Sequence, residues 1–277
     1  MRTVARFRWL TLMAGLAACG VVWGQTPAAP ADATPADPLV ESAQEWMGRA
    51  LILRGFYGGV ELVYDVKGHL QGGAPKVVDW TLAGMNIEKV SRNEAGLLVL
   101  EGPRVAIRYN PDQREFQRHP QKEERLRVMF PATDVAGLKA TLAAVFAVGI
   151  DPGVERSSPP YWRHYFLPAT EWTGADVVGP VVSVPGAAAP QGLVMPVLET
   201  KAEPELTGEA LRDKVKGTVQ VRVAVGVDGV PRQITIRQPL GYGLDERAAE
   251  AVAKYRFRPG TQDGKPIVVE MLVNQIF

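Results

Sequence analysis

The chain has 277 residues, of which 46% are hydrophobic and 22% are charged, and its formal net charge is +1. This length suits about two ordinary domains, and the near-neutral charge gives no broad attraction to nucleic acid, so no nucleic-acid partner is expected. The single cysteine, Cys19, excludes disulfides and thiolate metal clusters from the folded part. His69, His119 and His164 lack metal-ligand spacing, so we expect no metal and no cofactor.

Residues 1–24 have the pattern of an export signal. Arg2, Arg6 and Arg8 precede an uncharged, largely apolar run that ends in small residues. The clearly apolar part would span about 22 Å as a helix, which is shorter than the roughly 30 Å core of a bilayer. Three outcomes stay open: cleavage near Gly24, lipidation of Cys19 in the lipobox-like stretch "LAACG", or retention as an inner-membrane anchor. Each places the bulk of the chain in the periplasm or cell envelope.

Residues 25–37 are rich in alanine and proline and are predicted to be a linker. Residues 38–167 are predicted to form an antiparallel β-rich domain with flanking helices. An amphipathic helix is expected from Asp37-Pro38 through Leu53, and a second from Thr133, its expected cap, to Gly149. Short strands are expected between them, in an antiparallel meander, over 59–66, 76–82, 85–91, 96–102, 104–110 and 124–130.

An aromatic cluster, "YWRHYF", occupies residues 161–166. We interpret it as a seal at the edge of the meander, beside the turn at Pro159-Pro160. A ligand-binding face is the alternative. The next stretch, residues 168–196, thins out into proline, glycine, alanine and valine, and is predicted to be a second linker.

The clearest pattern lies between residues 217 and 277. Valines occupy every second position from Val219 to Val227, which predicts a strand with one buried face. Asp228-Gly229 predicts a type I′ hairpin turn, and Pro231 predicts that the second strand lies at an edge of the sheet. A helix is expected from Leu244, followed by a last strand from 267 to the end. We therefore predict a ββαβ module in which the first strand is central and the last pairs on its open side.

Residues 197–277 resemble the C-terminal domain of TonB, the energy transducer of bacterial envelopes. The resemblance is carried by Gly217 at the start of a valine-rich strand, the Val-Asp-Gly turn at 227–229, Leu244-Asp245 at the start of the helix, the run Tyr255-Arg256-Phe257-Arg258-Pro259, Gly264 in the following turn, and Phe277 at the end. The chain differs from the family in having Leu206-Thr207 where Tyr-Pro is common. It also carries a whole domain where the usual TonB has a long proline-rich spacer. The fold class expected for the chain is therefore α+β, a meander domain followed by a small TonB-like module.

The resemblance implies that an extended peptide of an outer-membrane TonB-dependent receptor adds a strand to the free edge of the sheet. On this chain that edge is the outer side of 267–276. The expected peptide-binding residues are Glu203, Glu205, Val268, Glu270, Leu272, Asn274 and Gln275. Inner-membrane motor proteins are the further partners implied. Capping of the edge by residues 197–206, or by a second copy of the chain, is the alternative to peptide binding.

A second function stays open: a cell-envelope structural or carrier protein, lipidated or not, whose middle domain holds an apolar ligand. The sequence lacks the motifs of a nucleophile elbow, a phosphate-binding loop or a zinc protease, and its carboxylates are scattered singly. We therefore expect no enzymatic activity.

Overall fold

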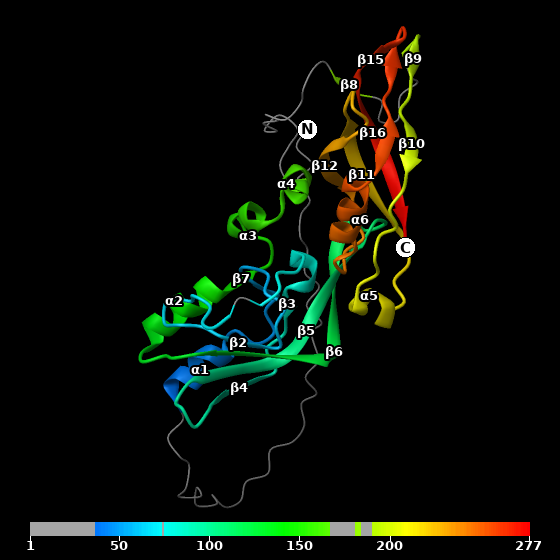
Figure 1. Ribbon diagram of the computed structural model, residues 1–277. Helices are drawn as coiled ribbons and strands as arrows, with labels where there is room; N and C mark the ends of the chain where they lie inside the picture. Colours follow the sequence, from blue (N-terminus) through cyan, green and yellow to red (C-terminus); the bar gives the residue numbers. More distant parts are fainter. Residues whose placement is uncertain (1–36, 74, 167–180, 184–189) are drawn as a thin grey trace, which may run out of the picture.

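The computed structural model describes residues 37–73, 75–166, 181–183 and 190–277 (Figure 1). The expected export signal with Cys19, nearly all of the 25–37 linker, and much of the 168–196 linker lie outside the described residues. The predicted α+β class is confirmed, because several sheets, mostly antiparallel, combine with a few short helices. Within the described residues, no helix combines the length and the apolar composition that a membrane crossing requires.

The middle region is built on one seven-stranded sheet. The strand order is β2-β6-β5-β3-β1-β7, and β4 pairs with β5 outside that path. All pairings are antiparallel except β2 with β6, which is parallel. The strands are β1 (Leu51–Leu53), β2 (Glu61–Val63), β3 (Gly84–Met85), β4 (Lys89–Arg92), β5 (Leu98–Asn110), β6 (Glu115–Phe130) and β7 (Phe146–Val148).

A long hairpin of β5 and β6 dominates this sheet. The two strands expected over 96–102 and 104–110 are one continuous strand, and its partner begins at Glu115 rather than at 124. Thirteen cross-strand pairs between Leu98↔Phe130 and Asn110↔Glu115 support the length, because each pair adds a side-chain contact and successive pairs alternate between the two faces. In Figure 1 this hairpin runs from the middle region to the C-terminal module.

Three local predictions in this region are wrong. The segment over 76–82 is not a strand: Asp79 caps a short 3-10 helix, η1 (Trp80–Leu82). The first helix, α1 (Pro38–Gln44), is short, and residues expected to continue it form β1 instead. The second, α2 (Val135–Val145), is capped by Asp134 rather than Thr133, because the Asp134 carboxylate accepts a 2.8 Å hydrogen bond from the Gly137 amide.

The aromatic cluster is helical. Two short helices, α3 (Pro152–Ser157) and α4 (Pro160–Phe166), follow β7, and α4 packs against a strand of the C-terminal module. Trp162 is fully buried beside Trp80, with ring centroids 5.3 Å apart. The cluster therefore seals the contact between the two regions of the chain, rather than an edge of the meander alone.

The C-terminal module has a sheet of order β12-β11-β16-β8. As predicted, β11 (Thr218–Val225) is central, with β12 (Pro231–Gln238) on one side and β16 (Val268–Ile276) on the other, both antiparallel. Helix α6 (Leu244–Ala253) packs on β11 and β12, and a shorter helix, α5 (Gly208–Arg212), precedes β11. The fourth strand, β8 (Val181–Ser183), pairs in parallel with β16.

The hairpin turn differs from the predicted type I′. Of Asp228 and Gly229, only the glycine has a positive φ, 72°. The Gly229 amide donates to the Gly226 carbonyl, and the Gly226 amide donates to the Val230 carbonyl. This is a type I turn followed by a left-handed glycine, the next most common hairpin connection. A Cβ on Gly229 would lie 1.8 Å from the Phe257 carbonyl oxygen, so only glycine fits there.

Two small sheets pair residues 193–200 with the segment between α6 and β16. One pairs β10 (Val197–Thr200) with β13 (Arg256–Arg258), and the other has the order β15-β14-β9. The latter strands are β9 (Leu193–Val194), β14 (Thr261–Gln262) and β15 (Lys265–Pro266).

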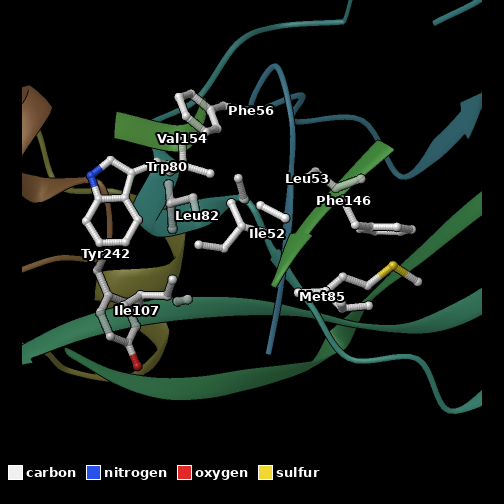
Figure 2. Close-up of a cluster of buried hydrophobic side chains, with 14 of the residues drawn as sticks. Ile52, Leu53, Phe56, Trp80, Leu82, Met85, Ile107, Phe146, Val154 and Tyr242 are labelled. Atoms are coloured by element: carbon white, nitrogen blue, oxygen red, sulfur yellow. The ribbon is translucent and has the colours of Figure 1, made fainter. Parts of the chain in front are cut away.

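One hydrophobic core extends through both regions. Its buried side chains come from the middle sheet and from the C-terminal module alike. Figure 2 shows Tyr242, from the C-terminal module, beside Ile107 of β5 and below Trp80 of η1. The module is therefore held in place by apolar packing against the middle region.

Candidate functional site

The edge of β16 that faces away from β11 is the candidate site. Gly217 and Phe277 exchange both of their backbone hydrogen bonds, and in an antiparallel ladder such pairs alternate with pairs that exchange none. The residues whose backbone N–H and C=O groups point to the outer edge are therefore Val268, Glu270, Leu272, Asn274 and Ile276. Four of these five are residues that the sequence analysis selected.

This edge is not free along its whole length. Strand β8 covers its first part, with the register Val268↔Val181, Val269↔Val182 and Glu270↔Ser183. Among the residues that the structure describes, no strand pairs with the outer side from Leu272 to Ile276. As far as the described part of the chain shows, the edge has an occupied section, 268–270, and a section without a strand partner, 272–276, which we call the accessible section.

The side chains of the occupied section are buried. Val268 is 6% exposed and Glu270 is 8% exposed. The Glu270 carboxylate lies 2.7 Å from the Arg222 guanidinium of the neighbouring strand. The ion pair neutralises the one charge that the sequence analysis placed on this edge. Glu270 therefore gives this edge little of the charge protection that exposed sheet edges usually carry.

The accessible section has a mixed surface. Leu272 is half-buried, Asn274 is exposed, and Ile276 is 80% exposed. The Asn274 side-chain oxygen accepts a 3.2 Å hydrogen bond from the Gln220 side chain on β11. A strand laid along this section would find main-chain groups that pair with no strand among the described residues, beside an exposed apolar side chain.

Gln275 belongs to the interior, contrary to its selection as a peptide-binding residue. Its side chain is 2% exposed and donates a 2.7 Å hydrogen bond to the Tyr255 hydroxyl. Tyr255 follows α6 and is itself buried. Because side chains alternate along a strand, Gln275 points to the helix-covered face. It fastens the last strand to the segment after the helix.

Glu203 and Glu205 lie outside the sheet, between β10 and α5. Both are exposed, and Glu203 pairs with Lys201 at 2.8 Å. Lys201 lies near enough to Tyr255 to interact with it electrostatically. These acidic side chains therefore lie in the segment before α5, and neither is one of the edge residues of β16.

The opposite flank of the module is attached to the middle region by main-chain bonds. The Tyr109 amide donates to the Leu240 carbonyl at 2.9 Å, and the Tyr242 amide donates to the Ile107 carbonyl at 2.8 Å. A Cβ on Gly241, whose φ is +88°, would lie 2.1 Å from the Ile107 carbonyl oxygen. Glycine is therefore required for this close approach.

Two buried carboxyl groups lie at this junction. Asp79 accepts hydrogen bonds from the Thr81 amide and the Trp162 indole N–H. Asp245 accepts from the amides of Leu240 and Gly241, each at 2.7 Å. Burial raises the pKa of Asp79 to about 7, with Glu246 as a second cause. Burial also raises the pKa of Asp245, with Asp79 as a second cause.

A cavity of about 390 Å³ lies beside the same junction. Its lining combines charged and apolar side chains: Gly58, Val60, Val78, Leu82, Arg104, Glu123, Glu124, Arg125 and Glu209. Both signs of charge reach the lining, which does not suit an apolar ligand. No cluster of potential metal ligands is present among the described residues.

Strand β8 lies within residues 168–196, for which the sequence predicts a linker. The stretch "PVVSVP", residues 180–185, does carry a signal, since its valines suit a strand and prolines flank it. Three residues are too few for a period to be visible. The pairing of this segment with β16 is visible in the structure and not in the sequence.

Comparison with known proteins identifies the C-terminal region. Residues 202–277 match the family model described as Gram-negative bacterial TonB protein C-terminal. No curated protein sequence matches the chain. The family is a non-enzymatic module of envelope energy transduction, and TonB proteins are periplasmic or associated with the envelope. The C-terminal region of this chain, residues 202–277, is a member of the TonB C-terminal domain family.

Proposed function

We propose that this protein binds an extended peptide of an outer-membrane TonB-dependent receptor by adding it as a strand to the outer edge of β16. The observation that carries the proposal is β8. The edge of β16 already accepts a strand in this chain, in parallel and in a defined register. Strand addition to an exposed edge gives affinity through main-chain hydrogen bonds, with neighbouring side chains supplying specificity.

The accessible section supplies what such a peptide needs. The backbone groups of Leu272, Asn274 and Ile276 point outward at every second residue, which is the spacing that an added strand pairs with. The exposed side chain of Ile276 gives the peptide apolar surface to cover. Glu203 is already paired with Lys201, so the exposed carboxylate of Glu205 is the one of the two that favours a positively charged peptide.

Coupling to an inner-membrane motor is a further part of this proposal. It requires that residues 1–24 stay on the chain as an anchor. Mass spectrometry of the mature N-terminus in membrane and soluble fractions separates the retained, cleaved and Cys19-lipidated forms. A cleaved, unlipidated form leaves peptide binding in place but removes direct coupling.

The test of peptide binding uses two substitutions at one outward-facing residue. Leu272→Pro removes the outward N–H without removing a bond to β11, because proline is tolerated where the amide of an edge strand faces solvent. Leu272→Ala removes the side chain and keeps the amide. We expect the full chain to bind peptides from the N-terminal segments of TonB-dependent receptors in fluorescence anisotropy. Leu272→Pro should weaken binding at least tenfold, and Leu272→Ala much less.

Thermal melts check that both variants fold. Equal affinities of the proline and alanine variants would contradict main-chain docking at this edge. Analytical ultracentrifugation of the unliganded chain tests the rival occupant, a second copy. A stable dimer that dissociates in Leu272→Pro would assign the edge to self-association instead.

A further inference from the structure

The chain carries its own occupant for the edge that the proposed function uses. Strand β8 lies in parallel on β16 at residues 268–270, directly before the accessible section. An added strand that ran the full length of β16 would meet β8 there. The two therefore compete for the backbone groups of Val268 and Glu270.

The register shows which residue of β8 matters most. Val182 lies opposite Val269, between the two outward-facing residues Val268 and Glu270. In a parallel ladder a residue in this position bonds to the residues on either side of its partner. Val182 is also half-buried. The main chain of this one residue therefore holds β8 on the edge.

The contact is short enough to be reversible. It comprises three residue pairs, compared with eight between β11 and β16. The central β11–β16 ladder therefore remains intact when β8 leaves. A visiting strand that pairs from 268 to 276 gains the accessible section as well, which β8 does not use. It can therefore replace β8 although β8 is tethered to the same chain.

We propose that β8 is an autoinhibitory strand, which lowers the affinity of the docking edge until a receptor peptide long enough to pair along the whole of β16 displaces it. This inference rests on the proposed function and adds its regulation. The apparent affinity equals the intrinsic affinity multiplied by the fraction of time that β8 is off the edge. If β8 occupies the edge about nine-tenths of the time, affinity falls about tenfold.

Peptide affinity of the full chain tests the inference. Val182→Pro removes the amide that faces β16, and Val182→Ala keeps it. We expect Val182→Pro to bind a receptor-derived peptide about tenfold more tightly than the unmodified chain, and Val182→Ala to change affinity less than threefold. A peptide short enough to pair only with 272–276 should bind both variants and the unmodified chain equally.

Amide hydrogen exchange provides a readout that needs no peptide. In the unmodified chain the Glu270 amide should exchange at least tenfold more slowly than those of Leu272 and Asn274. Val182→Pro should remove this difference and leave the inward-facing amide of Val273 protected. The protection of Val273 also shows that the variant sheet is folded.

The outcomes separate the two proposals. If the unmodified chain and Val182→Pro bind peptide equally and the Glu270 amide exchanges fast in both, the autoinhibitory role is wrong while the docking function stands. If neither binds peptide but exchange at Glu270 changes as expected, the docking function is wrong and β8 is only a structural cap. Tighter binding with loss of protection at Glu270 supports both proposals.

Discussion

The two flanks of the C-terminal sheet are built in opposite ways. On the β12 side, the module lies against α4 and β5, with fully buried side chains and two main-chain bonds to the middle region. On the β16 side, the described contacts are three residue pairs with β8. The difference shows that the edge with the proposed docking site is separate from the flank that attaches the module to the middle region. A partner can approach β16 without disturbing the surface that holds the module in place.

The largest expected effect comes from the attached flank. Trp162 is fully buried, stacks on Phe166 and donates its indole N–H to Asp79 at 3.2 Å. Trp162→Ala should lower the free energy of unfolding by about 3–5 kcal/mol, as for other buried aromatic truncations. Chemical denaturation measures it. Trp162→Phe keeps a ring in place and should cost clearly less, and a loss below 1 kcal/mol in Trp162→Ala would mean that α4 does not fasten the module.

The second effect is a dependence of stability on pH at the same flank. The Asp79 pKa is raised from 3.8 to about 7 in the folded chain. A raised pKa contributes stability that is complete below about pH 4 and is lost as the pH rises to about 7. The contribution lost over that window is at most about 4 kcal/mol. We expect the unfolding free energy to fall between pH 4.5 and 8, and Asp79→Asn to flatten that fall.

The control for this prediction is the difference in unfolding free energy between the unmodified chain and Asp79→Asn at each pH. Asp151 and Asp228, whose pKa values are held below 3.8 by hydrogen bonds with Arg54 and Arg232, stay ionised over this window. Asp245 is present in both proteins, but Asp79 is one cause of its raised pKa. Asp79→Asn therefore also lowers the Asp245 pKa, which adds to the flattening. Parallel curves for Asp79→Asn and the unmodified chain would show that the buried carboxyl group is not the source.

The smallest expected effect is on the open flank. Ile276 is 80% exposed and packs on little in the unliganded chain. Ile276→Thr keeps the branched side chain that suits a strand, so the unfolding free energy should change by less than about 0.5 kcal/mol. The same variant should weaken peptide binding in anisotropy measurements. A loss of stability comparable to that of Trp162→Ala would show that the end of β16 is packed and not available to a partner.

Sequence reasoning predicted the C-terminal module better than the middle region, for physical reasons. The alternating valines of β11 all point into the hydrophobic core, so their spacing of two residues identifies the buried face of the strand. In the middle region, the β5 hairpin is buried on both faces near its start and alternation is weak there. The segment at 76–82 looked like a strand because Val77, Val78 and Trp80 are apolar. The Asp79 side chain instead caps the 3-10 helix η1 by accepting a hydrogen bond from the Thr81 amide.

Of the candidate site, the strand and its outward residues were predictable, but the occupant was not. Val268, Glu270, Leu272 and Asn274 follow from the place of the last strand in the sheet and from the alternation of backbone groups. Gln275 was selected for its polarity, although its partner Tyr255 lies 20 residues away in the sequence. The sequence around Gln275 does not distinguish an exposed polar side chain at the edge from a buried one that hydrogen-bonds to a residue far away in the sequence.

The long β5–β6 hairpin has a mechanical consequence. A force applied along a peptide docked on β16 would act parallel to the strand axis. The hydrogen bonds of the eight residue pairs between β16 and β11 would then be loaded in shear and would resist it together. From β11 the strain passes through β12 to Leu240 and Tyr242, whose main-chain bonds clasp the end of β5. If the proposed docking holds, the thirteen-residue strand β5 would carry part of the load from the C-terminal module into the middle region.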